Sequence, residues 1–154
     1  MSDFTLEGGC QCGAIRYRLT APPLMAYACH CSECRRTTAS AFGVSCAVLQ
    51  DTMEITRGTL KRIDWEVQSG AHRYGEFCGE CGSRIRNGDV PSRGVFSLRA
   101  GTLDDQQWAE PVAHTWLSSK VGWFSVPDDA LTFDAQPTDY TPIIEAYQKR
   151  RGLA

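Results

Sequence analysis

Seven of the eight cysteines in this sequence lie in three short clusters, and thiolates are common ligands of zinc in proteins. The clusters are residues 10–12 (Cys-Gln-Cys), residues 29–34 (Cys-His-Cys-Ser-Glu-Cys) and residues 78–81 (Cys-Gly-Glu-Cys). Two clusters hold two thiols and one holds three. The two pairs together would make a closed site of four thiolates. The triple leaves one coordination position open, which is the arrangement of a catalytic zinc site.

The paired clusters are predicted to hold a structural zinc ion on Cys10, Cys12, Cys78 and Cys81. Alternate residues of a strand face the same side, so Cys10 and Cys12 can both reach one metal from an extended segment. The Cys-x-x-Cys spacing of the other pair is typical of zinc sites, and Gly79 or Gly82 permits its tight turn. Because the ligands come from distant parts of the chain, the binding energy of the metal would become folding energy.

The triple cluster is predicted to hold a catalytic zinc ion on Cys29, Cys31 and Cys34. Cys29 and Cys31 again alternate along a strand, and Cys34 follows by one helical turn. The alternative is a second closed site, with His30 or Cys46 as the fourth ligand. In an extended strand His30 points away from its neighbours, and Cys46 lies in an apolar segment where a small buried side chain is expected. The open site is therefore favoured.

Charge indicates which chemistry the open site would suit. Zinc with three thiolates carries a net negative charge, so it is a weaker Lewis acid than zinc held by neutral imidazoles. It still favours deprotonation of an incoming thiol, which makes a thiol substrate more fitting than water. Arg35 and Arg36 follow the triple directly, and one of them, with the helix N-terminus, could hold a carboxylate of the substrate. The alternative is that they offset the thiolate charge or lie in solvent.

The bulk composition indicates one globular domain over residues 1–154, with 42% apolar and 22% charged residues. A net charge of −2 without a Lys/Arg block argues against a nucleic-acid or membrane partner. The apolar runs are too short to span a bilayer, and the first residues do not resemble a signal peptide. A cytoplasmic location is therefore expected, where thiols stay reduced and metal ligation is favoured over a disulfide framework.

Short alternating segments separated by turn residues predict a mainly β, antiparallel fold. The expected strands cover residues 14–19, 25–28, 42–49, 53–56, 60–63, 72–77, 84–86, 95–99, 112–116, 123–126 and 131–133. A short helix is expected over residues 32–38 with Ser32 as its N-cap. A second helix should start after Thr141, with Pro142 in its first turn, and end before Gly152. Its buried stripe would be Ile143, Ile144 and Tyr147.

With these segments in view, the chain resembles the glutathione-dependent formaldehyde-activating family, which includes the centromere protein V-like proteins. The resemblance rests on residues 8–17, with Gly-Gly-Cys-Gln-Cys-Gly followed by Ile15 and Tyr17, on residues 29–36 and 77–83, and on the later elements His114-Thr115-Trp116 and Trp123. It covers roughly residues 7 to 134. One departure is Ala39, where the family usually carries glycine, and its methyl group could narrow the pocket or change how the short helix ends.

The resemblance implies a β-tent-like fold of small antiparallel sheets around zinc. It implies the same division of ligands, with a structural zinc on the four paired cysteines and a catalytic zinc, which could be labile, on the triple. The implied activity is that of a carbon–sulfur lyase joining glutathione to formaldehyde to give S-hydroxymethylglutathione. In the later elements, Trp116 and Trp123 are expected in the core, and the alternative is that they line a pocket. His114 is expected as a packed imidazole that shares a strand face with Trp116, and the alternative is a proton donor.

Two other functions are compatible with the same residues. A zinc-stabilised protein could bind glutathione or another small thiol without turnover, because adding a thiol to an aldehyde needs little catalytic machinery and no general base stands out in the sequence. A purely structural two-zinc module would instead require a fourth ligand that closes the second site.

Overall fold

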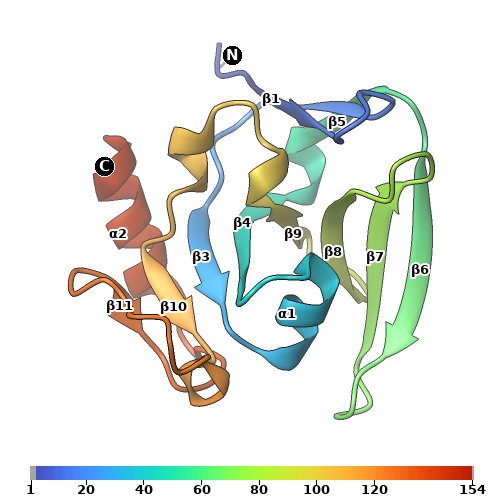
Figure 1. The fold of residues 1–154 in the computed structure, drawn as a ribbon. Coiled ribbons are helices and arrows are strands. Elements are labelled where there is room, and N and C mark those ends of the chain that lie inside the picture. The colour runs from blue at the N-terminus through green and yellow to red at the C-terminus, as the bar shows by residue number, and fades with distance from the viewer. Residues whose placement is uncertain (1–2, 154) are drawn as a thin grey trace.

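The computed structural model describes residues 3–153, and Figure 1 shows their fold. The strands are β1 (Leu6–Gly9), β2 (Arg16–Leu19), β3 (Met25–Cys29), β4 (Gly43–Leu49), β5 (Met53–Arg57), β6 (Leu60–Glu66), β7 (His72–Cys78), β8 (Arg84–Val90), β9 (Val95–Arg99), β10 (Ala113–Thr115) and β11 (Leu131–Thr132). The helices are α1 (Ser32–Thr38) and α2 (Thr141–Arg151), and short 3-10 turns are η1 (Gln50–Thr52), η2 (Ala100–Thr102), η3 (Gln106–Ala109) and η4 (Leu117–Ser119). The predicted mainly β fold with these two helices is confirmed.

The strands form two sheets. A small antiparallel sheet has the order β1-β2-β5, and a larger sheet has the order β11-β10-β3-β4-β9-β8-β7-β6. β10 runs parallel to both of its neighbours, β3 and β11, so the expectation of a purely antiparallel fold is wrong at this edge. Parallel neighbours require a long connection, and most of the large sheet is built between β3 and β10 in the chain.

The sequence pattern predicts most strands to within a few residues. For β9 the predicted and observed bounds, Val95–Arg99, are the same. The pattern is wrong for residues 123–126, where the structure has a turn followed by irregular chain. Trp123 is 77% exposed there. The segment has the alternating pattern of a strand, but among residues 3–153 it pairs with no other strand. The pattern also misses β1, because Gly8 and Gly9 have low strand propensity. Gly8 leaves room for the Tyr17 hydroxyl, with which a Cβ would collide. This hydroxyl lies 2.7 Å from Thr102 Oγ1.

Apolar side chains from both sheets meet in one buried cluster. The small sheet contributes Leu6, Tyr17 and Leu19, and the large sheet contributes Cys46, Val48, Ile85, Phe96 and Leu98. The small sheet is therefore fixed against the large one by burial of apolar area as well as by the cysteine site described below.

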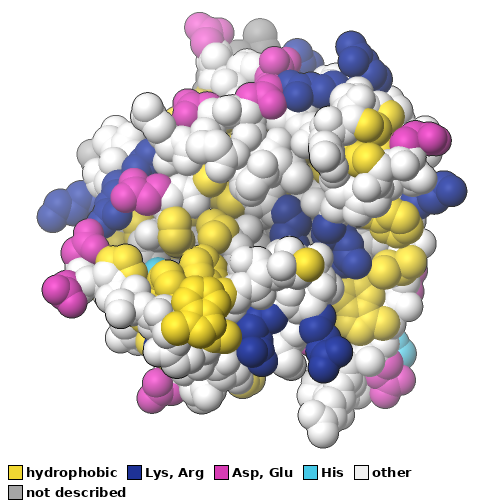
Figure 2. Space-filling model, in the orientation of Figure 1, with side chains coloured by type: hydrophobic (Ala, Val, Ile, Leu, Met, Phe, Trp, Pro, Cys, Tyr) yellow, Lys and Arg dark blue, Asp and Glu magenta, His cyan; other side chains and the backbone are white. Residues whose placement is uncertain are grey.

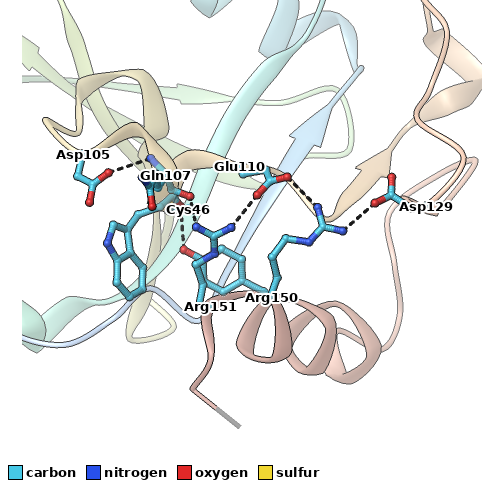
Figure 3. Close-up of polar contacts among 9 residues, drawn as sticks. Cys46, Asp105, Gln107, Glu110, Asp129, Arg150 and Arg151 are labelled. Carbon is cyan, nitrogen blue, oxygen red and sulfur yellow. Dashed lines mark hydrogen bonds and ion pairs between the residues drawn. The ribbon is translucent and has the colours of Figure 1, made fainter.

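Helix α2 packs against β3 through Ile143 and Tyr147, which are fully buried, while Ile144 is half-buried. The Tyr147 hydroxyl donates a 2.7 Å hydrogen bond to the Trp108 carbonyl. Figure 3 shows Arg150 and Arg151 at the end of the helix sharing Glu110, with Arg150 also bound to Asp129. The helix ends before Gly152, as predicted, and Gly152 has the left-handed conformation. Within residues 3–153, neither helix combines the length and the apolar character that crossing a bilayer requires.

Candidate metal centre

The sulfur atoms of the four paired cysteines lie within 4.8 Å of one another. Cys10 Sγ is 3.6 Å from Cys12 Sγ, and Cys12 Sγ is 3.8 Å from Cys78 Sγ. Sulfurs at about 2.3 Å from a tetrahedral zinc ion would be about 3.8 Å apart. The structure thus brings together the predicted four ligands at a spacing that fits zinc.

The local geometry of the first pair differs from the prediction. Cys10 and Cys12 belong to a turn between β1 and β2 and not to an extended strand. Gly13 has a φ of +79°, and its amide donates a 3.2 Å bond to the Cys10 carbonyl, which reverses the chain. The turn also directs the Ile15 amide to Cys10 Sγ at 3.2 Å. A backbone amide that donates to sulfur stabilises the thiolate form. Here the turn, and not an extended strand, brings this amide to Cys10.

The second pair closes a similar turn between β7 and β8. Gly82 has a φ of +77° and donates its amide to the Cys78 carbonyl at 2.9 Å, so Gly82 rather than Gly79 carries the left-handed conformation. Hydrogen bonds from Ser83 lower the pKa of Cys81 to about 5. Figure 1 shows this turn beside the blue β1–β2 turn, and the two turns come from different sheets. The four-cysteine group therefore joins the two sheets.

The three sulfurs of Cys29, Cys31 and Cys34 also lie within 4.8 Å of one another. Cys29 is the last residue of β3, and Cys31 and Cys34 lie at the start of α1. Cys29 is buried, whereas Cys31 and Cys34 are half-buried, so the group is covered on the β3 side and open on the helix side. Within residues 3–153, no further Cys, His, Asp or Glu joins these three sulfurs.

The N-cap of α1 is Cys31 and not the predicted Ser32. Its Sγ accepts a 3.3 Å hydrogen bond from the Cys34 amide, which is the contact that a capping oxygen would make. The helix ends at Ala39 with φ 49° and ψ 40°, a left-handed conformation that glycine adopts more easily. Ala39 therefore ends the helix in the way a glycine would, and the predicted change at the helix end is not seen.

Crowding separates the acidities of the three thiols. Contacts with Cys29 and Cys34 lower the pKa of Cys31 to about 2, and contacts with Cys29 and Cys31 raise the pKa of Cys34 far above its usual range. One thiolate stabilised by two thiols is thus favoured over three ionised sulfurs. A divalent cation would reverse this preference, because coordinating thiols lose their protons.

Neither candidate for a fourth ligand lies in the group of three. His30 is fully buried, and its Nε2 is 2.9 Å from His114 Nδ1, in contact with the rings of Phe42 and Phe124. Burial, followed by the charge of His114, lowers the pKa of His30 to about 4, and burial lowers the pKa of His114. Both rings are therefore neutral at neutral pH, so one can donate a proton to the other in this hydrogen bond. Cys46 is fully buried and lies 3.6 Å from the Trp108 carbonyl, as a small core side chain.

The later aromatic residues are not arranged as the sequence predicts. His114 is buried, as expected, but Trp116 does not continue its strand face, because β10 ends at Thr115 and Trp116 has a φ of +59°. Trp116 is half-buried and its Nε1 donates a 3.0 Å bond to Gln136. Trp123, expected in the core, is exposed.

Arg35 and Arg36 lie along an open cavity of about 360 Å³ on the side of α1. Ser32, Ser40, Ala41 and Val121 complete its lining. Arg35 is half-buried and Arg36 is exposed. Among the ion pairs of residues 3–153, none involves either arginine, so both guanidinium groups are available to an anion that enters this cavity. The cavity is lined by residues that include sequence neighbours of the three cysteines, and not by the cysteines themselves.

One residue beside the three cysteines is missed by the sequence reasoning. Arg99, at the end of β9, is buried and reaches α1 through Thr37, three residues after Cys34. The sequence did contain a pattern that could have identified Arg99. Ser97 and Arg99 alternate with the buried Phe96 and Leu98, so one face of this central strand is polar.

The comparison with known proteins agrees with this arrangement. Residues 5–119 match the model of the family described as glutathione-dependent formaldehyde-activating enzyme, and this range includes all seven clustered cysteines. The chain belongs to this family.

Relatives of this family member come from a fungus and a bacterium. A Penicillium rubens protein, 29% identical over 126 residues, and a Halomonas elongata protein, 28% identical over 126 residues, are both provisionally named glutathione-dependent formaldehyde-activating enzymes. The alignments cover 78% and 79% of this chain, with 64% of the Penicillium protein and 80% of the Halomonas protein. A crystal structure of a Rhodobacter sphaeroides protein aligns with 68% of this chain and 96% of its own, at 20% identity and a TM-score of 0.49.

Proposed function

We propose that this protein binds zinc at both cysteine groups and adds glutathione, or a similar small thiol, to formaldehyde or another small aldehyde. The observation that carries this proposal is the group of Cys29, Cys31 and Cys34, which no fourth ligand closes within residues 3–153. Family membership and the names of the two relatives support glutathione and formaldehyde as the substrates. The proposal includes a cytoplasmic location, where thiols stay reduced and can bind metal.

The residues have distinct roles in this proposal. Cys10, Cys12, Cys78 and Cys81 would hold a structural zinc ion between the two sheets, and the three other cysteines would hold the catalytic one. When bound there, zinc would supply a positive charge that lowers the pKa of a thiol arriving at its free coordination position. Arg35 or Arg36 would bind a carboxylate of that thiol or the developing negative charge on the aldehyde oxygen.

In the proposed reaction, the substrate sulfur forms a bond to the carbonyl carbon. The π electrons of the C=O bond move to the oxygen, which ends as a hydroxyl carrying the proton that the thiol gave up. The product is S-hydroxymethylglutathione, and the reverse reaction breaks the carbon–sulfur bond, as a carbon–sulfur lyase does.

The test is the rate of exchange between formaldehyde, glutathione and S-hydroxymethylglutathione, followed by NMR against the spontaneous reaction. Wild-type protein should accelerate the exchange, and Cys31→Ser should abolish the acceleration. Cys46→Ala is the matched control, because it removes a buried cysteine outside both groups and should keep the rate. If the wild-type and Cys31→Ser proteins both leave the spontaneous rate unchanged, the proposed catalysis is wrong.

A second function, thiol binding without turnover, is favoured by one observation. The residues that line the cavity beside α1 include no Asp, Glu or His that could act as a general acid or base. Calorimetric titration with glutathione separates the two functions: binding with no acceleration of the exchange supports the binding protein. Metal content per chain, before and after mild chelation, then tests whether glutathione binding follows the zinc on the three cysteines.

A further inference from the structure

Arg99 is a buried cation without an anionic partner. It is 7% exposed, its Nη1 donates to Ser45 Oγ at 3.2 Å, and its Nη2 donates to Thr37 Oγ1 at 2.8 Å. Its Nε has no partner within residues 3–153, and none of the ion pairs there includes it. A buried charge is costly unless it is paired, so a guanidinium held by two neutral hydroxyls retains donors that favour an anion.

Arg99 lies beside the group of three cysteines. A Cβ placed on Gly43 would be 2.9 Å from Arg99 Nη1 and 3.3 Å from Cys34 Cβ, so the two side chains border the same small space. Gly43 is paired with Cys29 across β3 and β4, and Ser45 is paired with Arg99 across β4 and β9. Arg99 and the three sulfurs therefore share one face of the large sheet, beneath α1.

Arg84 provides a second guanidinium near the same face. Its Nη1 is 2.6 Å from Asn87 Oδ1 and passes over Gly75, where any side chain would collide with it. Its guanidinium carbon is 5.8 Å from the centre of the Trp65 ring. Asn87 is paired with Ser97 across β8 and β9, and Ser97 lies two residues before Arg99 on the same face, so the two guanidinium groups lie over neighbouring strands on one face of the sheet. Burial and then the charge of Arg99 also lower the pKa of Arg84.

The lack of ion pairs here contrasts with the neighbouring strands. Arg73 pairs with Asp89 on this face of the sheet, and Arg86 pairs with Glu76 on the opposite face. Figure 2 shows dark blue Lys or Arg side chains set back in the hollow between α1 and β8, and others at its edge. Two adjacent unpaired cations repel each other, so their juxtaposition is stabilised when an anion binds between them.

We propose that Arg84 and Arg99 form a carboxylate-binding subsite on the sheet, which holds the carboxylate end of the thiol substrate. This inference rests on the proposed function for the identity of its ligand, but its anion binding can be measured without turnover. The substrate would then be a thiol that carries a carboxylate. Residues of the large sheet, and not only the arginines of α1, would select for that carboxylate.

The test uses S-methylglutathione, which keeps both carboxylates of glutathione and has no free thiol. It is titrated calorimetrically into the zinc-loaded wild-type, Arg84→Gln, Arg99→Lys and Arg93→Gln proteins. Arg93→Gln is the control, because Arg93 is an exposed arginine paired with Asp89. Arg84 is half-buried, so Arg84→Gln should fold even if changes at Arg99 do not.

The expected result is binding by the wild-type and Arg93→Gln proteins and about tenfold or greater weakening in Arg84→Gln, the effect of losing one charge-assisted hydrogen bond. Arg99→Lys should weaken binding too, because lysine cannot reproduce the guanidinium fork. Binding of 2-mercaptoethanol, a thiol without a carboxylate, should be the same in wild type and Arg84→Gln.

Three outcomes would overturn the subsite: no binding of S-methylglutathione by wild type, equal binding by wild type and Arg84→Gln, or equal losses for S-methylglutathione and 2-mercaptoethanol. The last two would mean that the arginines only offset the thiolate charge. Arg84-dependent binding of S-methylglutathione, together with an unaccelerated formaldehyde reaction, would support the subsite and refute the proposed catalysis. The two failures are therefore distinguishable.

Discussion

The sulfur of Cys31 accepts a hydrogen bond from the backbone amide of Cys34, with an N–Sγ distance of 3.3 Å. One of the three clustered thiols is thus also the N-cap of α1. The proposed metal ligand is thus also the residue that starts the helix. The two roles can be separated, because a hydroxyl can replace the sulfur as a cap but not as a zinc ligand.

Cys31→Ser should lose the zinc of the three-cysteine group and keep the helix, whereas Cys31→Ala should lose both. Serine is a good N-cap and alanine is a poor one, so Cys31→Ala should be less stable than Cys31→Ser by about 1 kcal/mol. Zinc content per chain and thermal unfolding measure the two effects. Equal stability of the two variants would show that the Cys31 cap is not needed for α1.

Cys12→Ser should destabilise the protein by several kcal/mol, because the metal proposed to join the two sheets would contribute its binding energy to folding. Cys12 is exposed, so the substitution removes a ligand with little loss of packing. Chemical denaturation measures the change. The control is the same comparison in excess chelator, where the wild-type and Cys12→Ser proteins should converge, and a difference that persists there would assign the loss to something other than metal.

Ala39→Gly should stabilise the protein by about 1 kcal/mol, because the left-handed conformation is strained for alanine and not for glycine. The matched control is Ala146→Gly in the middle of α2, where the same chemical change should destabilise by about 1 kcal/mol. Thermal unfolding of the two variants should give shifts of opposite sign. Shifts of the same sign would mean that the end of α1 does not carry this strain.

Acidification should destabilise the protein through His30. Its folded pKa, about 4, lies below the ordinary value of 6.5, so folding favours the neutral ring. The stability is therefore present above pH 6.5 and is lost as the pH falls towards 4, by about 2 kcal/mol at pH 5. The measurement is the free energy of unfolding between pH 7 and pH 5 for wild type and His30→Asn.

Release of a bound metal at low pH would affect both proteins equally. The difference between the pH dependences of their unfolding free energies therefore measures the contribution of His30 protonation. The wild-type curve should fall more steeply than that of His30→Asn. Parallel curves would mean that protonation of His30 does not oppose folding.

The spacing of the cysteines was enough to predict which sulfurs come together, because Cys-x-Cys and Cys-x-x-Cys allow few geometries. It could not predict the turn at Gly13 or the capping role of Cys31, since a strand and a turn both bring residues two apart within reach of one metal. Trp123 shows the limit of residue type: a large aromatic side chain favours the core, but only tertiary structure decides whether a core surface lies opposite it. Arg99 was missed because its unpaired state depends on partners distant in the sequence.

The parallel pairing of β3 with β10 has a consequence for synthesis of the chain. The outer edge of β3, the strand that carries Cys29, is paired with residues 112–115, and the His30 amide donates to the Thr115 carbonyl. During translation, β3 therefore remains an unpaired edge until these late residues have left the ribosome. Until then the packing around the three clustered thiols is incomplete, so early metal loading would protect the cluster from oxidation.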